Sequence, residues 1–345
     1  MNSTIILKGN ILYTPNPSAL VSIQQGYVIA VDGVVVHCGE SIPTVYTEYD
    51  VVDYGDNLII PGFVDTHAHA PQYCNRGLGM DKELLPWLET YTFPEEAKFI
   101  DPDYARLVYG AFVHDLWRNG TTRSILFGTI HKESTLVLMA LLQKAGLSAY
   151  VGKVNMDRNS PEFLIEETNQ SLADTKVWLD ASAQFGPLVK PIITPRFVPS
   201  CTSELMTGLA KLAKEHDVPV QSHLSENHGE IDWVASLHPE SSNYTDVYYE
   251  HHLMGTVPTV MAHCIHLSDV EMDRMAETQT MVSHCPYSNV NLSSGIAPIR
   301  KLIERNIPIG LGSDISGGHI VSMAKVLTEA IGLSKMKWAE VDPNY

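Results

Sequence analysis

Two histidines separated by one residue, His67 and His69, follow the apolar stretch 58–64 and suit metal chemistry. The stretch predicts a short buried strand, and α/β barrels and open parallel sheets carry their active sites at the carboxyl ends of such strands. Side chains two residues apart in a strand point to the same face. Two imidazoles on one face can bind a divalent cation such as zinc, iron or nickel, although a lone His-x-His pair can equally lie in an exposed loop.

Three further apolar stretches end in residues that can bind a metal. Residues 218–222 lead into His223, residues 260–262 into His263, and residues 307–313 into Asp314. Each residue alone is more often a core histidine or a helix N-cap aspartate. Because metal sites on barrels take their ligands from the ends of several strands, we predict that all five side chains converge.

Eight apolar stretches can supply the strands that bring these side chains together. They are centred near Ile60, Ile125, Tyr150, Ile193, Val220, Met261, Val282 and Ile309. Helical patterns alternate with them, which is typical of successive βα units around a parallel sheet. We therefore predict a (β/α)₈ barrel of the TIM type over residues 57–345, with a doubly wound open sheet as the alternative.

Helix starts are marked by capping residues. Asp101-Pro102 predicts the start of a helix that ends near Gly120, and Ser160-Pro161 predicts another that ends near Gly186. Ser268 with Glu271 resembles a capping box.

The first 56 residues predict a separate small β-rich domain. Short β-type stretches alternate with turns there, and Asp32-Gly33 lies between two apolar runs as in a tight hairpin. The chain is thus expected to consist of this domain, residues 1–56, and the barrel, residues 57–345.

The composition argues against nucleic-acid and membrane partners. The 345 residues include 23 Lys and Arg against 40 Asp and Glu, a formal net charge of −17, whereas a phosphate-backbone partner requires clustered basic residues. The five cysteines are odd in number and lack Cys-x-x-Cys spacing, as expected of reduced thiols. Without a signal-peptide pattern or a stretch long enough to span a bilayer, the chain is expected to be cytoplasmic.

Two sets of motifs extend over nearly the whole chain. The first set is Pro61-Gly62-Phe63-Val64-Asp65-Thr66-His67-Ala68-His69, His223, His263 and Gly312-Ser313-Asp314. The second set is Ala70-Pro71-Gln72-Tyr73, Tyr91-Thr92-Phe93-Pro94, Thr194-Pro195-Arg196-Phe197, Gln221-Ser222-His223-Leu224-Ser225-Glu226-Asn227 and Ser283-His284-Cys285-Pro286 with Ser288-Asn289. The first set resembles the amidohydrolase superfamily, and the second resembles, within it, the guanine deaminases. The resemblance implies a zinc enzyme, usually homodimeric, that hydrolyses guanine to xanthine and ammonia.

The chemistry that this reaction needs matches the predicted ligands. One zinc ion, or iron, held by His67, His69, His223 and Asp314 would lower the pKa of a bound water to about 7. Asp314 could also orient the resulting hydroxide, and by resemblance His263 lies beside it and stabilises the developing oxyanion.

Glu226 is the expected proton shuttle. It follows His223 by three residues at the end of the same predicted strand. We expect it to take a proton from water and deliver it to ring nitrogen N3. The alternative is an exposed glutamate at a helix start, where the helix dipole favours it.

Gln72, Arg196 and Phe197 are the expected substrate-binding residues. A planar purine requires hydrogen bonds in its plane and an apolar wall. Arg196 can donate to the carbonyl oxygen and N7 of guanine, Gln72 can donate and accept along the ring edge, and Phe197 can cover a ring face. Alternatively, Arg196 forms a surface ion pair and Phe197 belongs to the core.

The chain ends earlier than the resemblance leads us to expect. Guanine deaminases ordinarily continue beyond the last barrel helix, with strands that pair with the amino-terminal β unit, so that unit is expected to be an incomplete β-sandwich whose edges are covered by a dimer or a missing segment. Two other functions stay open: a related amidohydrolase acting on another purine, a triazine or an adenosyl compound, and a non-catalytic, truncated scaffold.

Overall fold

The computed structural model describes residues 3–343 and 345, and the chain divides into two compact units. The first unit ends at Gly62 and the second begins at Phe63. The boundary predicted after residue 56 falls inside strand β4 (Val51–Ile59), whose last residue pairs with Ile11 in the same sheet as its first residues. The amino-terminal unit therefore extends beyond the predicted boundary.

The first unit is a four-stranded sheet with the strand order β3-β2-β1-β4. Its strands are β1 (Thr4–Asn16), β2 (Ala19–Val31), β3 (Val34–Gly39) and β4 (Val51–Ile59). Strand β2 pairs antiparallel with both β1 and β3, whereas β1 and β4 are parallel. The predicted hairpin at Asp32-Gly33 is confirmed: both residues have positive φ, 49° and 81°, as a tight hairpin turn requires.

Eight parallel strands form the centre of the second unit. They are β5 (Phe63–His69), β6 (Thr121–Phe127), β7 (Ser148–Gly152), β9 (Val189–Pro191), β11 (Val220–Leu224), β12 (Thr259–His263), β13 (Met281–His284) and β14 (Ile309–Leu311). The first four make one sheet and the last four another, and β8 (Val154–Asn155) pairs with β10 (Thr194–Pro195).

Backbone hydrogen bonds join these two sheets into a closed ring. On one side, Ile193 N–H donates to Pro219 O at 2.9 Å. On the other side, Asp314 N–H donates to His67 O at 2.8 Å, which joins the last strand to the first. The predicted barrel is thus confirmed, and the open doubly wound sheet is not what this chain forms.

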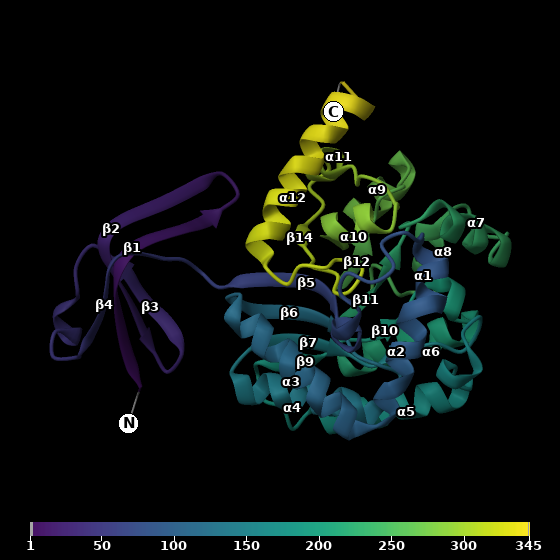
Figure 1. Cartoon of the computed structure of the whole chain (residues 1–345), viewed down its shortest axis with the longest axis horizontal. Coiled ribbons are helices and arrows are strands. Elements are labelled where there is room, and N and C mark those ends of the chain that lie inside the picture. The colour runs from purple at the N-terminus through teal and green to yellow at the C-terminus, as the bar shows by residue number, and fades with distance from the viewer. Residues whose placement is uncertain (1–2, 344) are drawn as a thin grey trace. The chain divides into compact units, whose positions relative to one another are not determined.

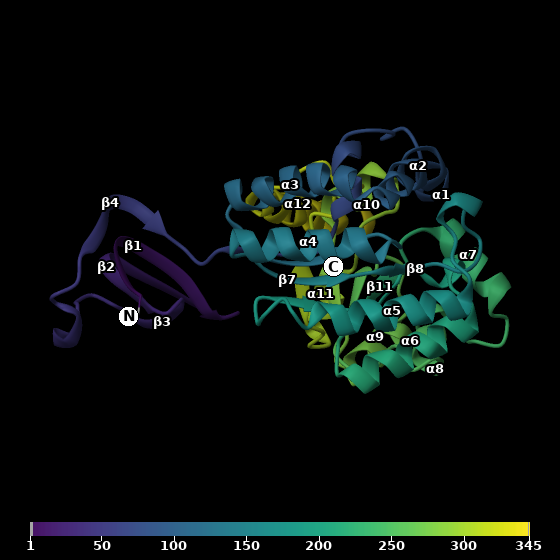
Figure 2. The same cartoon turned by 90° about the horizontal axis from the view of Figure 1, so that it is seen from below.

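Helices lie around the outside of the strands in the second unit (Figure 1), as the view from below also shows (Figure 2). The α-helices are α1 (Leu84–Trp87), α2 (Phe93–Glu96), α3 (Pro102–Arg118), α4 (Lys132–Ala145), α5 (Thr168–Ser182), α6 (Ser203–His216), α7 (His228–Leu237), α8 (Tyr244–Glu250), α9 (Asp269–Glu277), α10 (Pro286–Asn291), α11 (Ile299–Glu304) and α12 (Met323–Met336). Short 3₁₀ or π segments are η1 (Thr44–Tyr46), η2 (Ala70–Asn75), η3 (Leu88–Thr92), η4 (Ala97–Ile100), η5 (Glu162–Leu164), η6 (Val198–Ser200) and η7 (Lys337–Val341). Within the described chain, no helix combines the length and apolar character needed to traverse a lipid bilayer.

Two of the three predicted capping signals mark a helix start correctly. Asp101 caps α3 by accepting a hydrogen bond from Asp103 N–H, and Ser268 with Glu271 forms a complete capping box at α9. The predicted helix start at Ser160-Pro161 is wrong. Only one 3₁₀ turn follows that proline, and α5 begins at Thr168 with the Glu167 carboxylate as its cap.

Two strand predictions also need correction. The predicted strand 58–64 is divided between β4 and β5, because residues 60–62 lie outside both strands. The stretch near Ile193 is likewise not one strand: Ile193 lies between β9 and β10 and forms an isolated bridge with Val220. In the first place Pro61 lies in the gap and has no N–H to donate to a ladder. In the second, β9 pairs with β7 and β10 with β8, so the change of partner divides the stretch.

Gly152, at the end of β7, allows a close approach inside the barrel. A Cβ atom there would lie 1.8 Å from Thr194 Oγ1 and 2.8 Å from Gln221 Nε2. We expect Gly152→Ala to lower the free energy of unfolding by about 1–3 kcal/mol, measured by urea denaturation. The control is Gly110→Ala in α3, where the added methyl meets open space and should raise stability by about 0.5–1 kcal/mol. Unchanged stability of Gly152→Ala would contradict this account of the interior.

Candidate metal centre and substrate pocket

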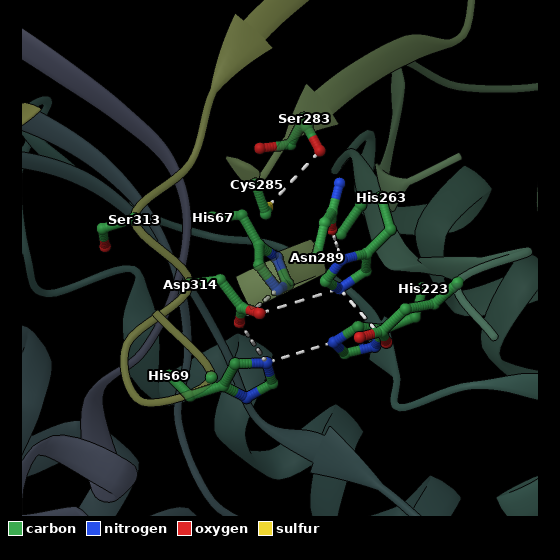
Figure 3. A network of polar contacts seen from close by, with 12 residues as sticks. His67, His69, His223, His263, Ser283, Cys285, Asn289, Ser313 and Asp314 are labelled. Atoms are coloured by element: carbon green, nitrogen blue, oxygen red, sulfur yellow. Dashed lines mark hydrogen bonds and ion pairs between the residues drawn. The ribbon is translucent and has the colours of Figure 1, made fainter. Parts of the chain in front are cut away.

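The strand ends bring the five predicted metal and catalytic side chains together at one mouth of the barrel (Figure 3). His69 Nε2 lies 3.1 Å from His223 Nε2. Asp314 Oδ1 lies 3.1 Å from His67 Nε2 and 3.5 Å from His69 Nε2. His263 approaches the other oxygen of Asp314 at 3.8 Å. All five side chains are buried, so the alternative of exposed loop histidines is wrong.

The ligand atoms form two overlapping groups. One contains His67, His69 and His223, and the other contains His67, His263, Cys285 and Asp314, with the atoms of each group within 4.8 Å of one another. The four predicted ligands are thus divided between groups that share His67. Because Asp314 also lies close to His69, both groups surround the same small space.

The protonation of the histidines suits metal binding. Burial, followed by the charge of His67, lowers the pKa of His69 and of His223 well below the usual value, so both imidazoles are neutral. His223 Nδ1 lies 2.6 Å from the carbonyl oxygen of Arg196, which can only accept a hydrogen bond. Nδ1 therefore carries the proton, and the lone pair of His223 is on Nε2, the atom that faces His69.

The carboxylate of Asp314 supplies negative charge at the same place. Burial alone would raise its pKa, but His67, with further contributions from His263 and His69, lowers the pKa well below the usual range. The buried His67 Nε2 contacts Asp314 Oδ1 as an ion pair and makes no hydrogen bond with any described residue. Three clustered imidazoles and one carboxylate together fit a divalent cation.

Cys285 lies within this group but does not match a thiolate ligand. Burial, followed by the charges of Asp314 and Asp65, raises the pKa of its thiol well above the usual value. Its Sγ lies 3.5 Å from the Ser283 carbonyl oxygen, as a weak donor would. A metal ligand must be a thiolate, so the protonated Cys285 is better explained as packing.

Glu226 and His263 lie beside the predicted ligands. His263 Nε2 is 3.3 Å from Glu226 Oε2, and its Nδ1 is 2.9 Å from Asn289 Oδ1. Burial, followed by the charges of Asp314 and Glu230, raises the pKa of Glu226 well above the usual value. The two neighbouring carboxyl groups, Glu226 and Asp314, therefore have pKa values shifted in opposite directions.

Glu230 fixes the backbone that carries Glu226. Its carboxylate accepts hydrogen bonds from Glu226 N–H at 2.9 Å and from Asn227 N–H at 3.3 Å, and it also accepts one from Tyr244 Oη at 2.8 Å. Asn227 and Glu230 form the capping box of α7, which begins at His228. Glu226 thus precedes the helix and is buried, so the alternative of an exposed helix-start glutamate is wrong.

A pocket opens beside this cluster, and the three predicted substrate-binding residues line it. Its lining consists of His69, Gln72, Leu84, Trp87, Leu88, Arg196, Phe197, His223, Glu226, His263, Leu292 and Asp314. Arg196 is only 3% exposed, so it is not a surface residue, and it pairs with the buried Glu96 at 2.6 Å. Phe197 belongs to the core as well as to the pocket, since it packs with Leu84, Leu88 and Leu292 in one apolar cluster.

Phe127 and Asp65 support the site without standing out in the sequence. The Phe127 ring centroid lies 4.5–5.0 Å from those of His67, His69 and His223. Asp65 accepts hydrogen bonds from Ser313 N–H at 2.9 Å and from Ser313 Oγ at 2.5 Å, which joins β5 to the segment after β14. Asp65 could have been found from the sequence as a carboxylate directly after the apolar stretch 58–64 and two residues before His67, whereas Phe127 carries no comparable signal.

The comparisons with known proteins agree with this architecture. The amidohydrolase family profile matches residues 58–344. The chain is 50% identical to guanine deaminase of Dictyostelium discoideum over 82% of its own length, and 38% identical to that of Escherichia coli over 91%. It spans 63% of the first relative and 72% of the second.

A solved structure gives the same result. Guanine deaminase from C. acetobutylicum, with guanine bound in its active site, is 48% identical and superposes with a TM-score of 0.97. The match covers 99% of this chain and 82% of that one. By the family match, the sequence identities and the shared structure, this chain belongs to the amidohydrolase family.

Proposed function

We propose that this protein hydrolyses guanine to xanthine and ammonia with the help of one bound divalent metal ion, for which we expect zinc, with iron as the alternative. The observation that carries the proposal is a single pocket lined by metal-binding side chains, by Glu226 and by the purine-binding candidates Gln72, Arg196 and Phe197. Identity to guanine deaminases over most of the chain supports it.

The metal would be held by His67, His69, His223 and Asp314. Neutral imidazoles and a carboxylate are ligands that zinc and iron both accept. When bound, such an ion makes a coordinated water acidic enough to act as a nucleophile near neutral pH.

Glu226 moves the protons of the reaction. It takes a proton from the attacking water and delivers it to N3, the ring nitrogen next to the attacked carbon C2. The water oxygen becomes the new carbonyl oxygen, and the exocyclic amine, after receiving the second proton, leaves as ammonia. A raised pKa makes the Glu226 carboxylate a stronger proton acceptor, so it can take the proton from water and hold it until the transfer to the ring.

His263 and Asp314 orient the reacting groups. Asn289 holds His263 by Nδ1, so that Nε2 faces the oxygens of Glu226 and Asp314. From this position His263 stabilises the oxygen that gains negative charge as C2 is attacked. Asp314 accepts a hydrogen bond from the nucleophile in addition to its role as a ligand.

The purine is recognised by its edge and its faces. Arg196 donates to the carbonyl oxygen and N7, Gln72 bonds along the ring edge, and Phe197 covers one face. Leu88 and Trp87 add apolar surface to the same pocket. This apolar surface excludes bulk water from the pocket, apart from the molecule that attacks C2.

Glu226→Gln tests the proton transfer. The amide keeps the size of the side chain but cannot shuttle protons, so guanine deamination, followed spectrophotometrically, should fall by about 10²–10⁴-fold. Metal content should stay that of the unmodified protein. The control is Glu277→Gln on the exposed side of α9, which should keep full activity; unchanged turnover of Glu226→Gln would remove this residue from the mechanism.

His69→Ala tests the metal site. We expect elemental analysis of the unmodified protein to find about one metal ion per chain and His69→Ala to retain far less, since one of four ligands is lost. The exposed His252 provides the control, because His252→Ala should leave the metal content unchanged. Equal metal content in both variants would place the ion elsewhere.

Two other functions are distinguished by the same assays. A related amidohydrolase that prefers 8-oxoguanine, a triazine or an adenosyl compound would release ammonia from that compound faster than from guanine. A non-catalytic scaffold would contain no stoichiometric metal. The resemblance further supports a homodimer, the cysteine pattern supports a cytoplasmic location, and the net charge argues against a nucleic-acid partner.

A further inference from the structure

Glu96, at the end of α2, contacts both polar side chains that we assign to purine binding but does not itself line the pocket. We propose that Glu96 is a positioning residue that fixes which hydrogen-bonding groups Gln72 and Arg196 present to the purine edge. This inference rests on the proposed function and adds a determinant of substrate specificity to it.

The first contact is a buried ion pair. Glu96 Oε2 accepts a hydrogen bond from Arg196 Nη1 at 2.6 Å, and both side chains are at most 3% exposed. Among residues 3–343 and 345, Arg196 has no other carboxylate within ion-pair distance. Since a buried guanidinium without a counter-charge is unfavourable, Glu96 determines where the Arg196 side chain lies.

The second contact fixes the amide of Gln72. Glu96 Oε1 lies 2.8 Å from one end of this amide, and the backbone N–H of Ser316 lies 3.2 Å from the other end. A carboxylate only accepts and a backbone N–H only donates, so the end near Glu96 must be the NH₂ group and the end near Ser316 the oxygen. Glu96 and Ser316 therefore require the same orientation of the Gln72 amide.

Both side chains keep hydrogen-bonding capacity for a ligand. Arg196 has used one of its five N–H donors on Glu96, and its guanidinium lies over the Phe93 ring at 5.2 Å. Gln72 has one N–H left, because its oxygen already accepts from Ser316 N–H at 3.2 Å and from Ser316 Oγ at 3.4 Å. Glu96 thus leaves Arg196 as a rigid donor and Gln72 as a donor whose remaining N–H has a fixed direction.

Glu96→Gln is expected to disturb both contacts. The new amide oxygen can still accept from Arg196, but its NH₂ group then faces the NH₂ group of Gln72, and neither can accept. If Gln72 turns over to relieve this, its NH₂ group meets the Ser316 N–H instead. One mismatch remains in either case, and Arg196 loses its counter-charge.

The test compares the binding of two purines by calorimetry on metal-loaded protein. Hypoxanthine carries the carbonyl that Arg196 would contact, whereas unsubstituted purine lacks it. The unmodified protein should bind hypoxanthine more tightly, and Glu96→Gln should reduce this preference by about tenfold or more. Metal content should not change, because His223 contacts the backbone oxygen of Arg196 and not its side chain.

Glu95→Gln is the matched control. Glu95 is the preceding residue, is also buried, and is also paired, but its partners are Lys98 and Tyr104. It should keep the hypoxanthine preference of the unmodified protein. A preference that is unchanged in Glu96→Gln, or affinities for both purines that fall equally in it, would overturn the inference.

A second variant covers the case in which Glu96→Gln does not fold. Exchanging the pair, Gln72→Glu with Glu96→Gln, keeps the total charge and matches every donor with an acceptor again, so the melting temperature should return close to that of the unmodified protein. Failure of this exchange to restore folding would show that Glu96 does not orient the amide.

Ammonia release from guanine separates this inference from the proposed function. Unmodified protein that prefers hypoxanthine but releases no ammonia would refute the deaminase proposal alone. Unmodified protein that deaminates guanine, together with a hypoxanthine preference that is unchanged in Glu96→Gln, would refute the role of Glu96 alone.

Discussion

The site depends on the closure of the barrel between its first and last strands. The chain places His67 and Asp314 far apart in sequence, and the hydrogen bond from Asp314 N–H to His67 O, at 2.8 Å, brings them into contact. His69 N–H donates to Ile315 O at 2.8 Å beside it, and Asp65 holds the intervening Ser313. Without these hydrogen bonds, the Asp314 carboxylate and the pair His67 and His69 would lie at opposite edges of an open sheet.

Burial then determines the charges of the groups that the contact between the first and last strands brings together. Imidazoles lose their protons when they are removed from water, so the pKa values of His69 and His223 are low. Neighbouring histidines stabilise the Asp314 carboxylate, whereas the same burial and the charge of Asp314 favour the protonated form of Glu226. The same buried environment therefore shifts the pKa values of two carboxyl groups in opposite directions, which suits Asp314 to bind a metal and Glu226 to carry a proton.

The backbone of the site is strained where it turns these side chains inward. His263 and Asp314 have positive φ values of 70° and 45°, a conformation that non-glycine residues adopt at a cost of roughly 1–3 kcal/mol each. The surrounding hydrogen bonds offset that cost. The contacts of His263 with Asn289 and of Asp314 with the first strand are examples.

The sequence by itself determined the barrel, the residues at its strand ends and their chemical types, because the alternation of apolar stretches and helical patterns is local information. It also marked Asp101, Ser268 and the Asp32-Gly33 turn, since caps and hairpins depend on neighbouring residues. It could not place Glu96 behind Arg196, or Phe127 beneath the histidines, because an acidic residue in a helix and a phenylalanine in a strand carry no sign of their long-range partners. Only the tertiary structure decided the end of the first unit, within 56–62, and the direction of the Gln72 amide, because both depend on hydrogen bonds between segments that are distant in the chain. It also decided the start of α5, where donors and acceptors compete locally.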